Sequence, residues 1–269
     1  METVVSGIRP TGNLHLGNYF GAVKGFLQMQ NEYNCLFFIA DWHSLTTHPH
    51  PENIRNSVRT ILAEYLACGI DPEKATIYVQ SDVPEVVELY LYLNMNAGIG
   101  ELMRTASFKD KARQQLHIDR VHTTEGDVER EIFNEGNKHS VSAGLLTYPT
   151  LMAADIIIHN AVKVPVGKDQ EQKMEMASRF ARRFNATYGV DFFPEPASFY
   201  YSHKAVKVPG LDGSGKMGKS EGNAIYLIDD EKAIKKKVMK AVTDAGPTEP
   251  NSVKPEPIAN LFTMMEIVS

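Results

Sequence analysis

The apolar positions at the start of the chain alternate between strand-like and helix-like spacing. Val4 to Ile8 is a short apolar run that ends in the turn-forming stretch Arg9 to Asn13, which predicts a buried strand and then a loop. Leu36 to Ala40 is apolar throughout, as expected of a parallel strand covered on both faces, and Thr76 to Gln80 has strand composition. Two stretches with helical spacing separate these strands, with apolar side chains at Leu16, Phe20, Val23 and Leu27, and at Ile54, Val58, Ile61, Leu62 and Tyr65.

This alternation predicts an α/β fold built on a doubly wound parallel sheet of the Rossmann-like, nucleotide-binding type. In such sheets ligands bind in the crevice beyond the carboxyl ends of the strands. The segments of functional interest are therefore the strand-to-helix turns. They begin at Arg9, Asp41 and Ser81, and again near Pro165 to Gly167.

The later part of the chain continues the pattern less regularly. We expect helices over residues 141–152 and 169–184, with a strand over 162–166 between them. The stretch from Arg113 to His139 is polar and weakly periodic, and we interpret it as a surface excursion from the main fold. A last amphipathic helix should follow Asp229.

Composition is that of an ordinary folded protein: 269 residues, 43% hydrophobic and 23% charged. No apolar run approaches the roughly 18 residues of a membrane helix, and no basic region precedes an apolar stretch at the N-terminus, so we expect a cytoplasmic protein that does not contact membranes. Cys35 and Cys68 lack ligand spacing, and we expect buried thiols with no disulfide and no cysteine-held metal. The net charge of −5 gives no global attraction to polyanions, so nucleic-acid contacts would need local basic patches.

The first turn, Gly12 to Asn18, has the features of a phosphate-binding segment. Glycine lets the backbone approach a phosphate, and a helix N-terminus presents oriented N–H donors. The His15 imidazole, with the Asn18 amide beside it, can stabilise charge on a transferring phosphoryl group. A structural turn with an incidental histidine fits these residues about as well.

The segment from Gly213 to Ser220 fits more than one interpretation. Its spacing matches the Walker A loop of NTPases, but a Walker A loop opens directly into a helix. Here Ser220 is followed by Glu-Gly-Asn and then by Ala224 to Ile228, which we expect to be a strand. We favour a mobile loop that carries Lys216 and Lys219 to a triphosphate, a task suited to an ammonium group on a flexible stem. A merely solvated basic loop is the remaining alternative.

Both segments resemble signatures of the class I aminoacyl-tRNA synthetases. His15-Leu16-Gly17-Asn18 is similar to the His-Ile-Gly-His signature, and Lys216 to Ser220 is similar to Lys-Met-Ser-Lys-Ser, in the family's order. Gly167 to Gln170 and Leu146 to Ile156 resemble the tryptophanyl enzymes in particular. The resemblance implies ATP-dependent activation of L-tryptophan to an adenylate and its transfer to tRNA(Trp), by a protein that is a homodimer in this family.

The resemblance also implies a role for each matched residue. ATP would contact Arg9, His15, Gly17, Asn18, Lys109, Lys111, Gly167, Asp169, Lys216, Met217, Lys219 and Ser220, and Gly17 would leave room for the adenine. The catalytic residues among these would be His15, Asn18, Lys111, Lys216 and Lys219. Tryptophan would contact Val5, Gly7, His43, Tyr148, Met152, Asp155 and Gln170, with Tyr148 and Gln170 at its ammonium group. No protein residue is expected to ligate a metal.

Asp155 would accept the indole N–H, a pairing that makes physical sense because indole is donor-only and an ionised carboxylate is acceptor-only. A substrate without that N–H would leave Asp155 buried and unpaired, which can supply a discrimination of about 10⁴. Without the resemblance, a helix-surface or capping carboxylate would be the better explanation of Asp155. Met152 would then be plain core, and His43 an ordinary histidine at a strand end.

The implied chemistry needs no protein nucleophile. The tryptophan carboxylate attacks the α-phosphorus of ATP and expels pyrophosphate, and a ribose hydroxyl of the tRNA then attacks the adenylate. Positioning and electrostatic stabilisation by Lys216, Lys219 and Mg²⁺ would provide the catalysis. The run Lys235-Lys236-Lys237 has a solvated helix face as its usual explanation, with tRNA contact as the alternative.

Several features depart from the family pattern. Gly218 replaces the middle serine of the lysine signature, Arg9 stands where many relatives have glutamine, and residues from about 113 to 141 look like an insertion. We expect a catalytic domain over 1–228 and the start of a helical tRNA-binding region over 229–269. The chain ends 49 residues after Ser220 (269 − 220), whereas the family usually continues. A protein truncated in this way could form the adenylate and yet fail to charge tRNA.

Other functions share some of these features. A tyrosyl-tRNA synthetase has the same fold and both signatures, and pyrophosphate exchange with tryptophan against tyrosine would separate the two. A nucleotidyltransferase unrelated to tRNA would show no exchange with either amino acid. A non-charging, tryptophan-binding paralogue would bind tryptophan without making the adenylate.

Overall fold

Five parallel strands form one sheet in the order β3-β2-β1-β4-β5. The computed structural model describes residues 1–46, 50–116, 125–132, 134, 141–166, 171–199, 207–219, 221–244, 246, 249 and 252–269. The strands are β1 (Thr3–Ile8), β2 (Asn34–Ile39), β3 (Ala75–Val79), β4 (Lys163–Pro165) and β5 (Ala197–Phe199). The strand order reverses between β1 and β4, so the crevice beyond their carboxyl ends is where a doubly wound sheet binds its ligand.

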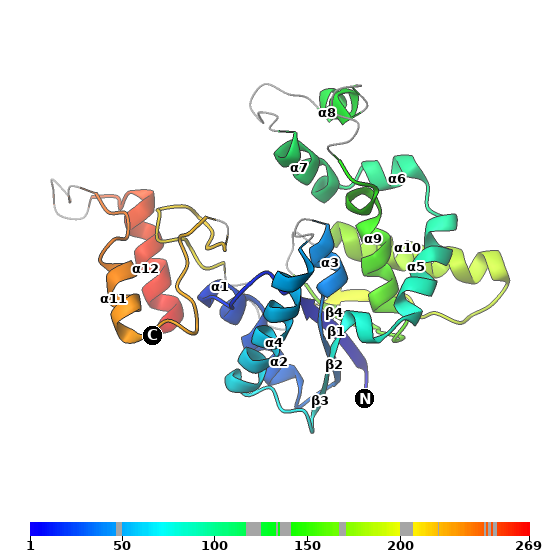
Figure 1. Cartoon of the computed structure of the whole chain (residues 1–269), viewed down its shortest axis with the longest axis horizontal. Helices are drawn as coiled ribbons and strands as arrows, with labels where there is room; N and C mark the ends of the chain where they lie inside the picture. Colours follow the sequence, from blue (N-terminus) through cyan, green and yellow to red (C-terminus); the bar gives the residue numbers. More distant parts are fainter. Residues whose placement is uncertain are drawn as a thin grey trace.

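Helices cover both faces of the sheet, and others extend beyond it (Figure 1). They are α1 (Leu16–Asn18), the π-helical turn η1 (Tyr19–Val23), α2 (Lys24–Met29), α3 (Asp41–Leu45), α4 (Pro51–Cys68), the 3₁₀ turn η2 (Gln80–Asp82), α5 (Glu85–Met95), α6 (Ile99–Met103), α7 (Ala106–Gln115), α8 (Glu125–Ile132), α9 (Ala143–Ile157), α10 (Glu171–Tyr188), α11 (Glu231–Val238) and α12 (Glu256–Val268). None of the described helices is long and apolar enough to cross a bilayer.

Successive strand residues supply two separate cores. Val4 and Phe37 pack with α2 and α4, whereas their neighbours Val5 and Phe38 pack with α5, α9 and α10. Figure 1 shows the same division, with α2 and α4 on one side of the sheet and α9 and α10 on the other. Because side chains alternate along a strand, continuous apolar runs are what a sheet covered on both faces requires. The predicted α/β class and parallel sheet are confirmed.

A third apolar cluster joins the lysine segment to the C-terminal helix. Met217 and Ile225 pack with Met264 of α12, beside the partly buried Leu16 of α1. Figure 1 shows α11 and α12 together at one end of the molecule, beyond α1. The second signature is therefore held between the first signature and α12.

The strand predicted over 224–228 is wrong: Tyr226 makes an isolated antiparallel bridge with His15, and the remaining residues of that stretch form turns and loops. The pairing with the first turn is this short because the chain turns at Asp229, whose carboxylate accepts the Tyr226 N–H at 2.7 Å. The polar excursion contains α8 and the end of α7, while residues 117–124 and 135–140 lie outside the described part of the chain.

Candidate active site

The first turn after β1 places His15 at the start of α1. His15 is 5% exposed, and its backbone N–H donates to Oδ1 of Asn18 at 3.1 Å. Burial, together with the charges of Lys219 and Lys216, lowers the pKa of His15 to about 4, so the imidazole is neutral at pH 7. Its Nδ1 is buried with no hydrogen-bond partner among the described residues. A buried ring nitrogen of this kind is suited to a polar ligand.

Gly17 is needed for the position of that ring. A Cβ at residue 17 would lie 2.8 Å from Cε1 and 2.9 Å from Nδ1 of His15, closer than packed atoms come. The imidazole therefore rests directly on the glycine backbone. The resemblance assigned Gly17 to adenine, and the structure adds the contact with His15 as a second reason for glycine here.

The lysine segment reaches this turn from the far end of the sequence. Nζ of Lys219 donates to the carbonyl oxygen of Gly12 at 2.7 Å, although the two residues are 207 positions apart. Lys216 is exposed, but its charge still acts on His15. The two signatures thus meet at one place, as the predicted site requires.

Asn223 organises the backbone of the lysine segment. Its Nδ2 donates to Oδ1 of Asp212 at 2.9 Å and to the carbonyl of Lys216 at 3.2 Å, and its Oδ1 accepts the N–H of Gly218 at 2.9 Å. No helix follows the segment among the described residues 221–230. This geometry excludes the Walker A interpretation, since a Walker A loop opens into a helix.

Gly218 lies against a carboxylate. A Cβ at this position would collide with the side chain of Glu221. The serine that many relatives carry here would displace Glu221 from its present position. Glycine at position 218 therefore leaves the space that Glu221, three residues later, occupies.

Glu64 of α4 lies beneath both signatures. Its Oε2 accepts the backbone N–H of Leu14 at 2.8 Å, and its Oε1 is buried with no hydrogen-bond partner in the described structure. Burial raises the pKa of Glu64, whereas the Leu14 N–H and the charge of Lys219 lower it. Glu64 also raises the pKa of Lys219, which burial and Arg9 lower. This carboxylate is the counter-charge of Lys219.

A second group of cations surrounds the ring of Tyr148 on α9. Nζ of Lys111 lies 4.4 Å from the ring centroid and Nζ of Lys173 lies 5.4 Å from it. Burial and the charges of Arg9 and Lys173 lower the pKa of Lys111 to about 8. Because Arg9 acts on both Lys111 and Lys219, the two groups of cations share one electrostatic field. Such clustered positive charge favours a polyanionic ligand.

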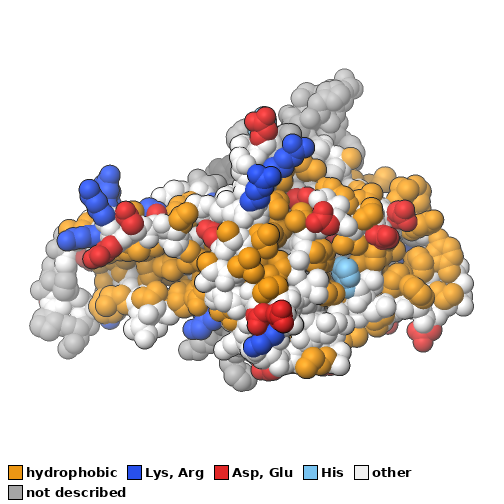
Figure 2. Space-filling view, turned by 60° about the horizontal axis from the view of Figure 1, so that its bottom comes forward, with side chains coloured by type: hydrophobic (Ala, Val, Ile, Leu, Met, Phe, Trp, Pro, Cys, Tyr) orange, Lys and Arg blue, Asp and Glu red, His pale blue; other side chains and the backbone are white. Residues whose placement is uncertain are grey.

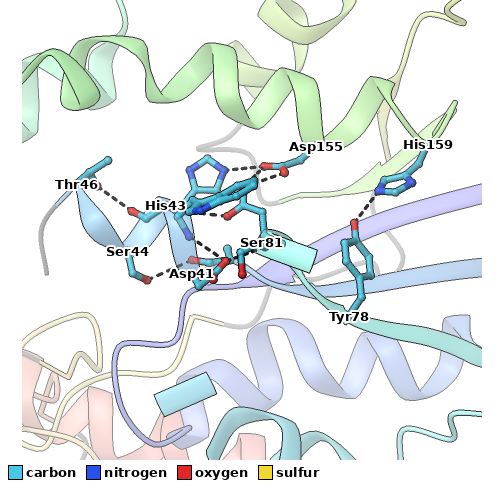
Figure 3. A network of polar contacts seen from close by, with 11 residues as sticks. Asp41, His43, Ser44, Thr46, Tyr78, Ser81, Asp155 and His159 are labelled. Carbon is cyan, nitrogen blue, oxygen red and sulfur yellow. Dashed lines mark hydrogen bonds and ion pairs between the residues drawn. The ribbon is translucent and has the colours of Figure 1, made fainter. Parts of the chain in front are cut away.

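Asp155 lies on α9, about two turns after Tyr148. Its carboxylate is 1% exposed and accepts from Nε2 of His43 at 2.8 Å, and Figure 3 shows these two side chains pointing toward one another. Nε2 of Gln80 donates to both carboxylate oxygens, at 2.8 and 2.9 Å. The rings of His43 and Tyr148 meet edge to face at 6.4 Å between centroids. The Asp155 group and the cation group are therefore adjacent.

The remaining predicted residues fall into two sets. Val5 is buried on β1, Met152 is half-buried on α9 three positions before Asp155, and Lys109 is buried on α7. Gly7 lies against Phe38, whose ring atoms would be 2.8 Å from a Cβ at residue 7. Gly167, Asp169, Gln170 and Ser220 lie outside the described residues.

The sequence did not reveal four residues that the structure brings into the site: Glu64, Gln80, Lys173 and Asn223. Glu64 lies in a helix that was predicted from its apolar positions, and these positions do not indicate a role for its carboxylate. Gln80 gave the clearest available signal, since it ends a predicted strand at the carboxyl edge of the sheet. Lys173 lies in the helix predicted over 169–184, and Asn223 lies between the lysine segment and the stretch 224–228.

Comparisons with known proteins test the resemblance to a family. The model of class I tRNA synthetases (W and Y) matches residues 2–267. A tryptophan–tRNA ligase of Porphyromonas gingivalis is 74% identical over the whole chain, which spans 76% of that relative. The chain belongs to the tryptophanyl-tRNA synthetases. As a member of this family it is an aminoacyl-tRNA ligase for tryptophan.

Solved structures support the same assignment. The tryptophanyl-tRNA synthetase of Campylobacter jejuni, solved with ADP and tryptophan, has 34% identity and a TM-score of 0.78, over 98% of this chain and 74% of that one. A tyrosyl-tRNA synthetase of Archaeoglobus fulgidus shares the fold at 20% identity and a TM-score of 0.66, over 98% of this chain and 71% of that one. High sequence identity to a tryptophan enzyme thus separates this synthetase from the tyrosyl alternative, which shares its fold alone.

Proposed function

We propose that this synthetase activates L-tryptophan with ATP in the crevice where its two signatures meet. The observation that carries the proposal is the contact between Lys219 Nζ and the Gly12 carbonyl, which joins both signatures beside the buried His15. A triphosphate bound there would replace the carbonyl of Gly12 as the partner of Lys219. The ADP and tryptophan bound by the Campylobacter jejuni relative support the same pair of ligands here.

In this proposal two groups of cations contact different parts of the triphosphate. Lys216 and Lys219 stabilise the charge that develops as pyrophosphate leaves, and Lys111, Lys109 and Arg9 hold the phosphates from the Tyr148 side. His15 donates a hydrogen bond from a neutral ring, and Asn18 contacts a phosphate oxygen from the same turn. Gly17, Met217, Gly167, Asp169 and Ser220 complete the ATP site as the resemblance implies.

The amino acid lies on the other side of Tyr148. Asp155 accepts the indole N–H, and Val5, Gly7, His43 and Met152 line the pocket. Tyr148 and Gln170 take the ammonium group. Lys173 joins this assignment from its place over the Tyr148 ring, where its charge would attract the tryptophan carboxylate.

Mg²⁺ is proposed as the counter-ion that ATP brings. Among the described residues no group of three His, Cys, Asp or Glu side chains could hold a metal, and the site is lined by cations instead. A metal held by protein carboxylates therefore does not fit the described site. The positioning chemistry belongs to the lysines and His15.

Transfer to tRNA(Trp) is the second proposed step. On α11, Lys235 and Lys236 are exposed and available to a phosphate backbone. Lys237 has an internal role, since its Nζ lies 2.5 Å from Asp229 Oδ2 and over the ring of Tyr226. We place the reaction in the cytoplasm, where ribosomes use charged tRNA. We keep the division into a catalytic domain (1–228) and a tRNA-binding region (229–269) as a proposal.

A homodimer is also proposed. Exposed apolar side chains gather on α5, at Val87, Leu91, Tyr92 and Met95. Figure 2 shows hydrophobic side chains collected at the end of the molecule where α5 and α10 lie. An apolar patch of this kind is typical of a protein interface.

Amino-acid-dependent exchange of pyrophosphate into ATP tests the proposed activation. We expect exchange with tryptophan, and exchange with phenylalanine lower by about 10⁴-fold or more, because phenylalanine has no donor and leaves the Asp155 carboxylate buried and unpaired. Equal exchange with both amino acids would refute the specificity, and exchange with neither would refute the activation.

Proton uptake on ATP binding is expected at mildly alkaline pH. The pKa of Lys111 is lowered to about 8 by burial, Arg9 and Lys173, and that of Lys219 to about 8 mainly by burial. At pH 8.5 both amines are therefore largely neutral without ligand. A bound triphosphate raises both pKa values, so protons must be taken up.

Calorimetry in two buffers with different ionisation enthalpies measures this uptake. We expect about one to two protons per ATP at pH 8.5 and nearly none at pH 6.5, where both lysines are already charged. ATP affinity should correspondingly fall as pH rises above about 8. The same uptake at both pH values would contradict the explanation.

A further inference from the structure

We propose that Gln80 is a positioning residue for tryptophan recognition, whose amide holds the Asp155 carboxylate in the orientation that accepts the indole N–H. The inference rests on the proposed role of Asp155 and adds to it a residue that the sequence did not assign. Gln80 is fully buried in η2, directly beyond the carboxyl end of β3. From there it faces a residue 75 positions away.

One nitrogen of Gln80 bridges both oxygens of Asp155. Nε2 lies 2.8 Å from Oδ1 and 2.9 Å from Oδ2, which restricts rotation of the carboxylate about its last torsion. Asp155 is itself 1% exposed, so water does not compete for its orientation. Terminal carboxylate torsions are broad unless partners fix them. The bridging amide is such a partner.

The orientation of the Gln80 amide is fixed by a second contact. Its Oε1 accepts the backbone N–H of His43 at 3.4 Å. A reversed amide would direct N–H groups at that N–H and an oxygen at the carboxylate, and both arrangements are repulsive. The start of α3 therefore determines that Gln80 presents donors to Asp155.

The contacts leave Asp155 with capacity for one more donor. An ionised carboxylate has about four lone-pair sites, and the two contacts from Gln80 and the one from His43 occupy three of them. Gln80 and His43 together thus determine where the remaining acceptor site points. Because Gln80 is neutral, it holds the carboxylate without neutralising its charge.

A second contact joins the same two regions of the chain farther from the pocket. The hydroxyl of Tyr78 lies 2.8 Å from Nε2 of His159, and Figure 3 shows this pair beside the Asp155 group. Tyr78 precedes Gln80 by two residues, and His159 follows Asp155 by four. The end of β3 and the turn after α9 are therefore joined by Tyr78 and His159 as well. Gln80 is not needed merely to keep the two elements together.

The test compares two substrates in the full chain. Tryptophan and 3-(benzothiophen-3-yl)alanine have nearly the same shape, but sulfur replaces the indole N–H in the second. Pyrophosphate exchange gives kcat/KM for each. We expect Gln80→Met, which keeps the side-chain length and removes the donors, to lower kcat/KM for tryptophan by about 10- to 100-fold and that for the analogue by less than about threefold.

Gln30→Met is the matched control. Gln30 is another buried glutamine with contacts to the backbone of Gly69 and Asp71, away from Tyr148 and Asp155. It should lower thermal stability without changing the ratio between the substrates. If Gln80→Met does not fold, Gln80→Leu replaces it: this side chain also lacks donors and should lower the ratio by a similar factor.

The outcomes distinguish the role of Gln80 from the role of Asp155. An equal loss on both substrates, or no loss on tryptophan, would show that Gln80 has only a structural role or none, and would overturn the inference while leaving Asp155 intact. A wild-type enzyme that does not distinguish the two substrates, or Asp155→Ala with an unchanged ratio, would overturn the proposed role of Asp155 and the inference with it.

Discussion

Replacing Lys219 with alanine is expected to slow formation of tryptophanyl adenylate by about 10²–10³-fold, the usual cost of removing one donor that stabilises a transition state. Lys219 contacts the first signature through Gly12, whereas Asp155 contacts His43 and Gln80. Tryptophan affinity should therefore change by less than about threefold. Single-turnover kinetics measures the first quantity, and equilibrium binding without ATP measures the second.

Two further measurements sharpen this prediction. Lys240→Ala removes an exposed lysine just after α11 and should leave both quantities unchanged. The pKa of His15, lowered to about 4 by burial and then by Lys219 and Lys216, should rise in Lys219→Ala, which NMR can follow. An equal loss of rate and tryptophan affinity would count against a role confined to the transition state.

Replacing Asp155 with alanine should have a comparably large effect on specificity. The wild-type site is expected to favour tryptophan over 3-(benzothiophen-3-yl)alanine by on the order of 10⁴-fold, because the analogue leaves a buried acceptor without its donor. In Asp155→Ala neither substrate meets an acceptor at this position, and the ratio should fall toward one. The ratio of kcat/KM values from pyrophosphate exchange measures this.

The variant also leaves donors without a partner. Gln80 and His43 both direct N–H groups at Asp155, and each loses its acceptor. We therefore expect a loss of about 2–4 kcal/mol in the free energy of unfolding, which urea denaturation can measure. Retention of the full ratio by a folded Asp155→Ala protein would disprove the assignment of the indole N–H to this carboxylate.

The parts of the fold that were predictable are those in which local pattern and burial agree. The apolar runs at β1 and β2 are covered on both faces, and their sequences show it without ambiguity. The segment 224–228 has strand composition but lies at the edge of a loop, where pairing is limited to a single bridge with His15. Composition alone cannot distinguish a strand from a loop that packs its side chains inward.

The site follows the same logic. His15 and Lys219 were predictable because each lies in a compact motif with a recognisable spacing. Gln80 and Glu64 act through partners brought together by the fold, namely Asp155 and the N–H of Leu14. A polar residue whose role depends on a partner tens of positions away carries little local signal: Glu64 has none, and Gln80 has only its place at the end of a predicted strand. Its role becomes visible only when the strand edges and helices are assembled.

The link between Lys219 and Gly12 has a consequence for how this enzyme tolerates change. The acceptor is a main-chain oxygen, at a glycine whose φ of +105° few other residues adopt. A substitution at residue 12 cannot remove the acceptor, because it is a main-chain carbonyl. A substitution that forces the turn to a negative φ would, however, move that carbonyl. Selection at this position therefore acts on the path of the chain and not on a functional group.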